Sequence, residues 1–277
     1  MAVDGLDTVA EVSEKGGVGK TSVTSGMAAV AAEWGLRVGV ADLDPRCTLT
    51  DEMGITDPER SVNDIFYTES QKRPPDPAEI AREVLMRAGP AWPSNVFVLP
   101  CIREFGNRET DPATGMEFRL KRALWGLRED LDLVLMDVPP RPGGKIAGAA
   151  LIATRKVVIP ATLTNDGWSG AVEAIKTIEH FNTPGGLNED LELSCIVRSI
   201  VPRDGEMRQI HYDWQNRLLE DFGDLVLQTV LKNYAVREVA RTACAPITAA
   251  PGREAKLLVS AYGEILTHAL PHLKEKR

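Results

Sequence analysis

Short apolar runs alternate along the chain with longer segments whose apolar residues follow a helical spacing. The apolar runs predict strands at residues 37–41, 95–99, 131–138, 156–160, 191–197 and 225–231, together with a short strand around Thr8, Val9 and Val12. Helical spacing predicts helices after residue 20, at 78–88, at 116–127, after Gly167, within 202–222 and at 253–270. This alternation is typical of an α/β fold. We expect a three-layer, doubly wound and mostly parallel sheet of about seven or eight strands flanked by helices.

Two of the predicted helices have apolar faces that should pack against this sheet. The face of the segment 116–127 comprises Phe118, Leu120, Ala123, Leu124 and Leu127, and that of the segment 253–270 comprises Leu258, Ala261, Tyr262 and Ile265. With 277 residues, of which 43% are hydrophobic and 26% charged, the chain can bury a sizeable core. We therefore expect residues 1–277 to form one domain, with a proline-rich surface excursion at about residues 68–95.

A glycine-rich loop with two lysines follows the first predicted strand. It runs Lys15-Gly16-Gly17-Val18-Gly19-Lys20-Thr21-Ser22, with Glu14 where the ordinary P-loop pattern has glycine. Glycines allow positive φ angles and close approach of the backbone, so that successive N–H groups can point toward phosphate oxygens. Lys20 can then reach the β and γ phosphates while the Thr21 hydroxyl holds Mg²⁺. The loop predicts a nucleotide site at the start of a helix, whose N-terminus favours an anion.

Acidic residues stand at the carboxyl ends of two predicted strands, where ligands bind in doubly wound sheets. Asp42 and Asp44 follow the strand 37–41, and alternation along an extended segment sends both carboxylates to one side with Leu43 opposite. Asp137 ends the strand 131–138 and precedes two prolines. Carboxylates beside a triphosphate suit the orientation of water and the binding of Mg²⁺, although an acid at a strand end can also cap the next turn.

The loop with two lysines resembles the deviant Walker A motif of the ParA/MinD group of P-loop ATPases, and the segments 42–45 and 137–140 resemble that group's D-x-D-P and D-x-P-P motifs. The resemblance implies an ATPase that binds ATP or ADP with Mg²⁺ and forms a dimer around ATP. Lys15 would cross the dimer interface to the partner's nucleotide, Asp44 would orient the attacking water, and Asp42 and Asp137 would support Mg²⁺. The sequence at 46–48 departs from the family's usual Gln-Gly-Asn, and residues 141–144 would form a neighbouring switch.

Further nucleotide contacts rest on the resemblance alone. It places the adenine pocket around Arg198, Ser199, Pro202 and the loop after Leu231, which begins with Lys232. It also places a ribose or interface contact at residues 164–166. Asp166 is equally suited to cap the helix that begins near Gly167.

The same resemblance associates the region after the last predicted strand with non-specific DNA contact. The candidate cations are Arg203, Arg208, Lys232, Arg237, Arg241 and Lys256. The net charge of the chain is −8, and residues 198–241 hold seven bases and seven acids. A basic patch would arise only if folding separates these charges, and a solvated face of mixed charge is the alternative.

Cysteines and the C-terminal segment bear on rival functions. The four cysteines, at positions 47, 101, 195 and 244, form no C-x-x-C pair, which favours free thiols in a reducing cytoplasm. Cys101 lacks a well-placed companion in the sequence, which argues against an iron–sulfur reductase of the same superfamily; an amide-forming synthetase is also less favoured. The last helix has no Phe or Trp on its apolar face and is broken by Pro271, so packing is favoured over a MinD-like membrane anchor.

The N-terminal sequence and the resemblance to the ParA/MinD group together indicate a location and a function. There is no signal peptide and no run of about 18 apolar residues, so we expect a cytoplasmic, nucleoid-associated protein. About 14 residues precede Lys15, which leaves no room for a helix-turn-helix domain and indicates the short ParA type. We expect a DNA-partition ATPase whose slow hydrolysis is stimulated by a ParB-like centromere-binding or cargo-adaptor protein. A ParA-like ATPase for a protein cargo and a MinD-like membrane regulator are the alternatives.

Overall fold

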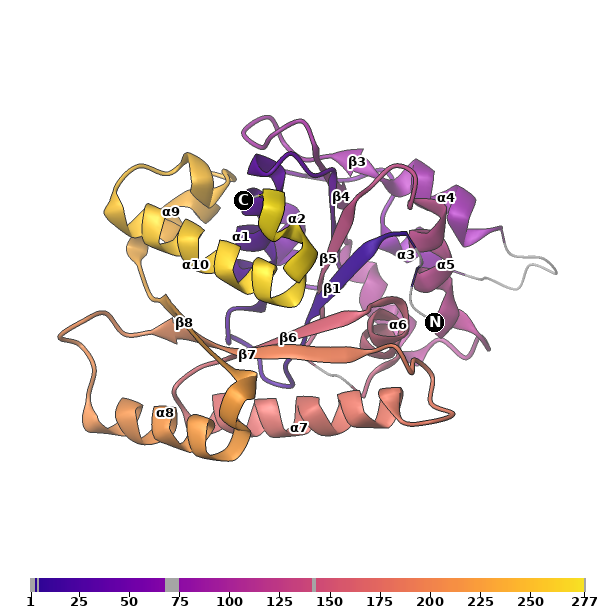
Figure 1. Cartoon of the computed structure of the whole chain (residues 1–277). Coiled ribbons are helices and arrows are strands. Elements are labelled where there is room, and N and C mark those ends of the chain that lie inside the picture. Colours follow the sequence, from indigo (N-terminus) through magenta and orange to yellow (C-terminus); the bar gives the residue numbers. More distant parts are fainter. Residues whose placement is uncertain (1–2, 4, 68–74, 141–142, 277) are drawn as a thin grey trace.

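The computed structural model describes residues 3, 5–67, 75–140 and 143–276. Eight strands form one sheet in the order β3-β4-β2-β5-β1-β6-β7-β8 (Figure 1). Neighbouring strands are parallel except at one edge, where β3 runs antiparallel to β4. The strands are β1 (Asp7–Glu11), β2 (Val38–Asp42), β3 (Met86–Arg87), β4 (Val96–Leu99), β5 (Leu133–Asp137), β6 (Lys156–Ala161), β7 (Glu192–Val201) and β8 (Val226–Lys232). The predicted α/β class, with a mostly parallel sheet of seven or eight strands, is confirmed.

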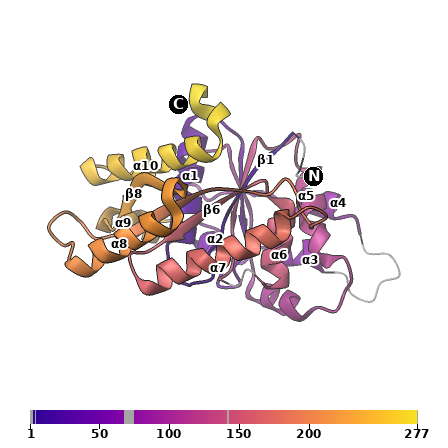
Figure 2. The same ribbon diagram turned by 60° about the horizontal axis from the view of Figure 1, so that its bottom comes forward.

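Helices cover both faces of the sheet (Figures 1 and 2). The helices α1 and α10 pack together on one face, while α3 to α7 contribute to the core of the other. The α-helices of the described residues are α1 (Lys20–Glu33), α2 (Thr48–Glu52), α3 (Val62–Phe66), α4 (Pro77–Val84), α5 (Arg119–Gly126), α6 (Lys145–Ala153), α7 (Asn165–Asn182), α8 (Gln209–Phe222), α9 (Ala235–Thr242) and α10 (Arg253–Ala269).

Alternation along the central strands divides the core into two layers. Val9 and Leu135 point to the α1 face, whereas Ala10 and Met136 point to the opposite face, and all four side chains are fully buried. Strand β5 is buried at every position, as expected for a central parallel strand covered on both sides. The strand order also reverses around β1, which places the loop after β1 where open α/β sheets bind ligands.

A glycine permits the close packing of α1 against α10. A Cβ atom at Gly26 would lie 2.4 Å from the ring of Tyr262, closer than any side chain tolerates. Tyr262 is itself fully buried, together with the predicted packing residues Leu258, Ala261 and Ile265. The predicted inward face of the last helix is therefore confirmed.

Two predicted helices differ from the structure at one end. The helix predicted at 78–88 ends at Val84, because the backbone of Met86–Arg87 pairs with β4 and forms the edge strand β3. The helix predicted at 116–127 begins with a 3₁₀ turn, and Phe118 is 44% exposed instead of facing the sheet. Local spacing did not reveal either the sheet edge or the tighter first turn.

The predicted strand 191–197 is also longer than expected, since β7 runs to Val201 and includes Arg198 and Ser199. Of the predicted excursion, residues 68–74 lie outside the described residues, as do Arg141 and Pro142 of the predicted switch. The remainder of the excursion contains α4, whose Ile80 and Val84 are buried in the core.

Candidate nucleotide-binding site

The glycine-rich loop connects β1 to α1 and curls around the Lys20 side chain. Gly17 and Gly19 have φ angles of 76° and 91°, which are accessible to glycine at little cost. Lys20 is 7% exposed, and its ammonium donates a hydrogen bond to the Lys15 carbonyl at 3.2 Å. Burial lowers the pKa of Lys20. An ammonium buried in a loop of this shape is suited to an anionic ligand, which would replace its lost hydration.

A hydrogen bond from β7 fixes the middle of the loop. The Ser199 hydroxyl donates to the Val18 carbonyl at 2.6 Å, and the Val18 side chain is 3% exposed. Val18 therefore contributes backbone to the loop while its side chain anchors it. This bond links segments that lie far apart in the sequence, which explains why local patterns could not predict it.

Two buried carboxyl groups lie side by side at the ends of β2 and β5. Asp42 and Asp137 are register partners in parallel strands, and they are 0% and 1% exposed. Asp137 accepts a hydrogen bond from the Thr21 hydroxyl at 2.5 Å, while Asp42 accepts bonds from the backbone N–H and hydroxyl of Thr50 at 2.8 and 2.7 Å. Burial raises the pKa of Asp42 to about 7, and burial together with Asp42 raises the pKa of Asp137 to about 8.

These groups fit a hard divalent cation. The side chains of Thr21, Asp42 and Asp137 offer only oxygen ligands. A positive charge beside the two buried carboxyl groups would stabilise their ionised forms, which burial disfavours. The described residues contain no cluster of three or more His, Cys, Asp or Glu side chains that could bind a metal by themselves. Mg²⁺ in proteins usually takes one or two carboxylates plus phosphate oxygens and waters.

Asp44 lies at the edge of the site rather than in its buried floor. Its backbone N–H donates to Asp42 at 3.2 Å, and its carboxylate accepts a bond from the backbone N–H of Arg46 at 3.0 Å. Asp44 lines the cavity described next, whereas Leu43 is buried on the opposite face. The predicted opposite orientation of Leu43 is confirmed.

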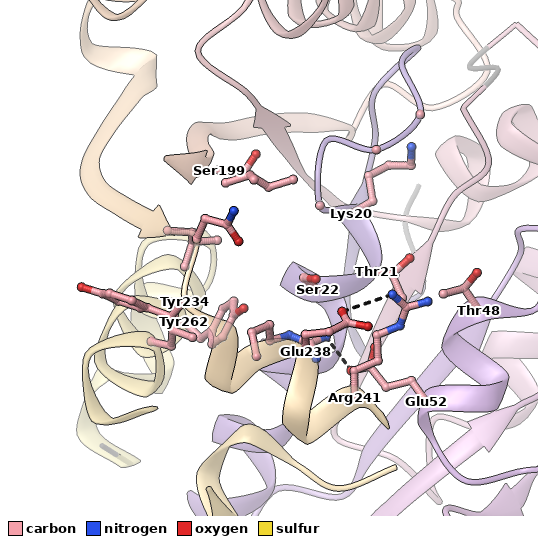
Figure 3. Close-up of a pocket in the computed structure, with 18 of the residues that line it drawn as sticks. Lys20, Thr21, Ser22, Thr48, Glu52, Ser199, Tyr234, Glu238, Arg241 and Tyr262 are labelled. Carbon is pink, nitrogen blue, oxygen red and sulfur yellow. Dashed lines mark hydrogen bonds and ion pairs between the residues drawn. The ribbon is translucent and has the colours of Figure 1, made fainter. Parts of the chain in front are cut away.

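A cavity of about 430 Å³ opens beside the loop (Figure 3). Figure 3 shows Lys20 and Ser199 at one end and Glu52 and Arg241 at the other. A cavity of this size is sufficient for a small organic ligand. The lining comprises Gly16, Gly17, Gly19, Lys20, Thr21, Ser22, Asp44, Arg46, Thr48, Glu52, Pro140, Ser199, Ile200, Leu231, Lys232, Asn233, Tyr234, Ala235, Arg237, Glu238, Arg241, Leu258 and Tyr262.

Comparisons with known proteins agree with this geometry. A family model described as an AAA domain matches residues 7–193. The chain is 30% identical over 229 residues to the chromosome-partitioning ATPase Soj of Thermus thermophilus, a match that covers 80% of each protein. It is also 30% identical over 183 residues to the sporulation initiation inhibitor protein Soj of Bacillus subtilis, covering 63% of this chain and 67% of that protein.

The chain belongs to the ParA/MinD group of P-loop ATPases.

Solved structures show the same fold as this ParA/MinD-type chain. An ATP complex of a Cyanothece McdA variant has a TM-score of 0.80 at 18% identity and covers 98% of both chains. Cobyrinic acid a,c-diamide synthase from Mycobacterium smegmatis, with bound ADP and magnesium, has a TM-score of 0.74 at 22% identity and covers 95% of both chains. At these identities the likeness concerns the fold alone.

The family's additional lysine lies outside the cavity. Lys15 is absent from the lining given above, and its ammonium lies 3.6 Å from the Asp166 carboxylate on α7. The two side chains are 43% and 74% exposed. The interpretation of Asp166 as a helix cap is wrong, because the Thr164 hydroxyl caps α7 by accepting a bond from the backbone N–H of Gly167.

The expected adenine residues fall into two groups. Ser199 and Lys232 line the cavity, together with Asn233 and Tyr234 of the predicted loop after Leu231 and with Ile200, which the sequence did not single out. Pro202 is not among the described residues that line it. Arg198 is 6% exposed and donates to the carbonyls of Leu227 and Gln228, so its role there is to hold β8.

Arg237 is not available for the predicted surface contact with DNA. Its side chain is 13% exposed, and it donates bonds to the Glu52 carboxylate at 2.6 Å and the Ser25 hydroxyl at 2.7 Å. The pairing with Glu52 raises the pKa of Arg237 against the opposing effect of burial. This correction arises because α9 turns that side of the helix toward α1 and α2.

Most of the other predicted DNA-binding cations are ion-paired with acids. Arg203 contacts Glu206, Lys232 contacts Asp204, and Arg241 contacts Glu238. Within the described chain, Arg208 and Lys256 have no ion pair. The mixed-charge alternative therefore describes much of this surface in the isolated chain.

Sequence reasoning overlooked two residues that lie beside the acids. Thr50 holds Asp42, as described above, and Glu11 ends β1 as the register partner of Asp137. Glu11 is fully buried, and burial raises its pKa well above the ordinary value. An acid inside an otherwise apolar strand was the signal that could have identified Glu11, whereas nothing local distinguishes Thr50.

The thiols of Cys47 and Cys101 both donate to backbone carbonyls close by in the sequence. Cys47 donates to Pro45 at 3.5 Å and Cys101 to Ile102 at 3.3 Å. Cys101 is 1% exposed, which leaves it unable to reach a second subunit and weighs against the reductase. All four cysteines are free thiols, as predicted. In the described residues, no helix is both long and apolar enough to span a membrane.

Proposed function

We propose that this chain is an ATP-dependent dimerising ATPase for DNA segregation, in which ATP and Mg²⁺ occupy the cavity beside the glycine loop. The placement of Lys15 is the observation that carries the proposal. A lysine that is held at the surface by an exposed acid, while Lys20 fills the loop, is suited to a nucleotide in another subunit. The relatives named as partitioning ATPases support the same reading.

Within the site, each residue has a distinct task. Lys20 and the loop N–H groups bind and orient the β and γ phosphates, while Thr21, Asp42 and Asp137 would hold Mg²⁺. An Mg²⁺ ion held there would offset the negative charge that develops on the phosphate oxygens. Asp44, at the cavity edge, orients the attacking water for in-line displacement, and Lys15 stabilises the same charge from the partner subunit.

The dimer would bind DNA without sequence preference and release it after a ParB-like or cargo-adaptor partner stimulates slow hydrolysis. Arg208 and Lys256 are the leading DNA contacts, because ion pairs within the described chain engage the other four predicted cations. Dimerisation can bring two copies of these residues together and thereby build a basic surface that one copy lacks. A nucleoid-associated location would follow.

DNA co-sedimentation with ATP, ADP or no nucleotide tests this function. We expect the natural chain to sediment with DNA only with ATP. The Lys15→Ala variant should still bind ATP but fail to dimerise or sediment, while Lys176→Ala, which removes another exposed and paired lysine, should behave normally. Sedimentation with DNA that does not depend on the nucleotide, or no sedimentation at all, would contradict the partition proposal. ATP-dependent sedimentation with liposomes would favour a MinD-like regulator, and ATP-dependent capture of a protein assembly without DNA would favour cargo positioning.

A further inference from the structure

Arg46 is a charged residue of the nucleotide cavity to which the proposed mechanism gives no task. It lies on the loop after β2, two residues after Asp44, and both residues line the cavity. The other two arginines of the lining, Arg237 and Arg241, pair with glutamates. Within the described residues, the exposed guanidinium of Arg46 has no ion pair. An arginine without an acidic partner at a ligand cavity is available to bind an anion.

The guanidinium of Arg46 lies over the start of the phosphate loop. A Cβ atom built on Gly16 would lie 4.0 Å from Arg46 Nη1, so the guanidinium is a direct neighbour of Gly16. The Lys20 ammonium donates to the Lys15 carbonyl at the same end of the loop, at 3.2 Å. Lysines in loops of this type reach the β and γ phosphates, so Arg46 lies where the terminal phosphate would bind.

The charges around Lys20 also favour an anion at this position. Burial lowers the pKa of Lys20, and the positive charge of Arg46 acts in the same direction. Asp137 and Asp44 oppose this effect only in part. Two cations held close together repel each other, and a phosphate group bound between them would replace that repulsion with attraction.

One turn of backbone presents Arg46 and Asp44 to the same ligand. The Asp44 carboxylate accepts a bond from the Arg46 N–H at 3.0 Å, and the next residue, Cys47, has a φ of 57° in the left-handed region. Non-glycine residues seldom adopt this conformation, which is concentrated at functional segments. Asp44, Arg46 and Thr48 line the cavity, whereas Leu43 and Cys47 pack in the core.

We propose that Arg46 is a further catalytic residue, whose guanidinium binds the γ phosphate of the nucleotide held by its own subunit. This role deepens the proposed ATPase function and rests on it. In hydrolysis the water oxygen bonds to the γ phosphorus and the bond to the β–γ bridging oxygen breaks, which yields ADP, inorganic phosphate and one proton. A guanidinium offers two parallel N–H groups to the oxygens on which charge develops. The family's usual glutamine at this position carries no charge, so the role is particular to this chain.

Steady-state hydrolysis and equilibrium binding with the full chain test the role. Arg46→Gln should lower kcat on the order of 10²-fold, as removal of one preorganised donor does. Its affinity for a non-hydrolysable ATP analogue should fall by about tenfold, while its affinity for ADP stays unchanged. Arg60→Gln is the matched control, because Arg60 is exposed and pairs with Asp64 and Glu83 outside the cavity. Unchanged kcat in Arg46→Gln, or equal loss of affinity for both nucleotides, would overturn the inference.

A mixture of two impaired variants decides whether Arg46 acts within its own subunit. If Arg46 and Asp44 serve the same nucleotide, each site in a mixed dimer of Arg46→Gln and Asp44→Ala lacks one of them. Turnover of the mixture should then equal the mean of the separate variants. If Arg46 reached the nucleotide of the partner, one site of the mixed dimer would be complete. Recovered turnover would therefore overturn the inference.

The proposed function can fail separately from this inference. If the natural chain hydrolyses ATP without binding DNA, the partition function fails and the kinetics of Arg46→Gln still decide the inference. If the natural chain hydrolyses no ATP, the ATPase function fails, and binding decides instead. Equal affinities of Arg46→Gln and the natural chain for the ATP analogue would then overturn the inference. A natural chain that binds neither nucleotide would overturn both.

Discussion

The phosphate loop and the segment from β7 to α9 both carry charged residues with predicted functions, but these charged groups are buried around the loop and exposed in the other segment. Around the loop, Lys20, Asp42 and Asp137 are withdrawn from water and fixed by hydrogen bonds and strand register. In the other segment, Arg203 and Arg241 stay at the surface beside acids three residues away. Buried charges with shifted pKa values indicate a site that requires a ligand, whereas exposed local pairs contribute little specificity.

Both kinds of environment occur on a single helix, at Arg237 and Arg241. Arg237 lies on α9, one turn before Arg241, yet it reaches inward to Glu52 while Arg241 remains outside. Sequence spacing alone gave both residues the same predicted role. Both arginines line the nucleotide cavity. They differ in depth, since Arg237 pairs with the buried Glu52 and Arg241 with the exposed Glu238.

Removal of the buried loop lysine should have the largest effect. In Lys20→Ala the phosphates lose the only ammonium that fills the described loop, and we expect ATP turnover to fall by about 10²–10³-fold. Nucleotide affinity should fall as well, as measured with a fluorescent ATP analogue. The exposed Lys176→Ala serves as the control. If both variants kept the same turnover and nucleotide affinity, the buried lysine would have no special role and the contrast between the two regions would be wrong.

Asp44→Ala should separate binding from hydrolysis. Asp44 borders the cavity but is not part of the phosphate loop. We therefore expect ATP binding to persist while hydrolysis falls by about 10²-fold or more. Phosphate release and equilibrium binding measure the two quantities. Asp51→Ala changes an acid on α2 whose carboxylate does not line the cavity and should leave turnover intact. Retained turnover in Asp44→Ala would place the water-orienting role elsewhere.

The two arginines of α9 should differ in their effect on stability. Arg237→Ala leaves the Glu52 carboxylate buried and unpaired, which should lower the free energy of unfolding by about 3–5 kcal/mol. Arg241→Ala removes an exposed pair and should cost about 0–1 kcal/mol. Urea unfolding checks both values. Similar values for both variants would mean that the buried and the exposed ion pair contribute equally to stability.

The last prediction concerns the dependence of stability on pH. In the folded chain without nucleotide or metal, burial raises the pKa of Asp42 from 3.8 to about 7 and that of Asp137 from 3.8 to about 8. The folded state therefore binds more protons, so stability from these groups is present below pH 3.8 and is lost as pH rises toward 8. Melting temperature measured from pH 5 upward should decline less in Asp137→Asn than in the natural chain. An identical decline would show that Asp137 ionises freely.

How much could be predicted from the sequence depended on how local each feature was. The β1–loop–α1 unit and the acids at strand ends were predictable, because each motif lies within a few residues and its backbone geometry follows from glycine positions and apolar runs. The start of α5 and the edge strand β3 were not, since a sheet edge and a 3₁₀ turn depend on neighbours distant in the chain. Thr50 was missed for the same reason, and so was the bond from Ser199 to the Val18 carbonyl.

The sequence by itself determined the fold class, the phosphate loop and the residues of its acids, because strand periodicity, glycine content and strand-end position are local properties. The tertiary structure alone decided that Asp42 and Asp137 are neighbours and that Arg237 faces Glu52. Those contacts follow from the strand order and from the placement of α9 beside Ser25 and Glu52. Both depend on burying the apolar faces of the whole chain together, which no single segment encodes.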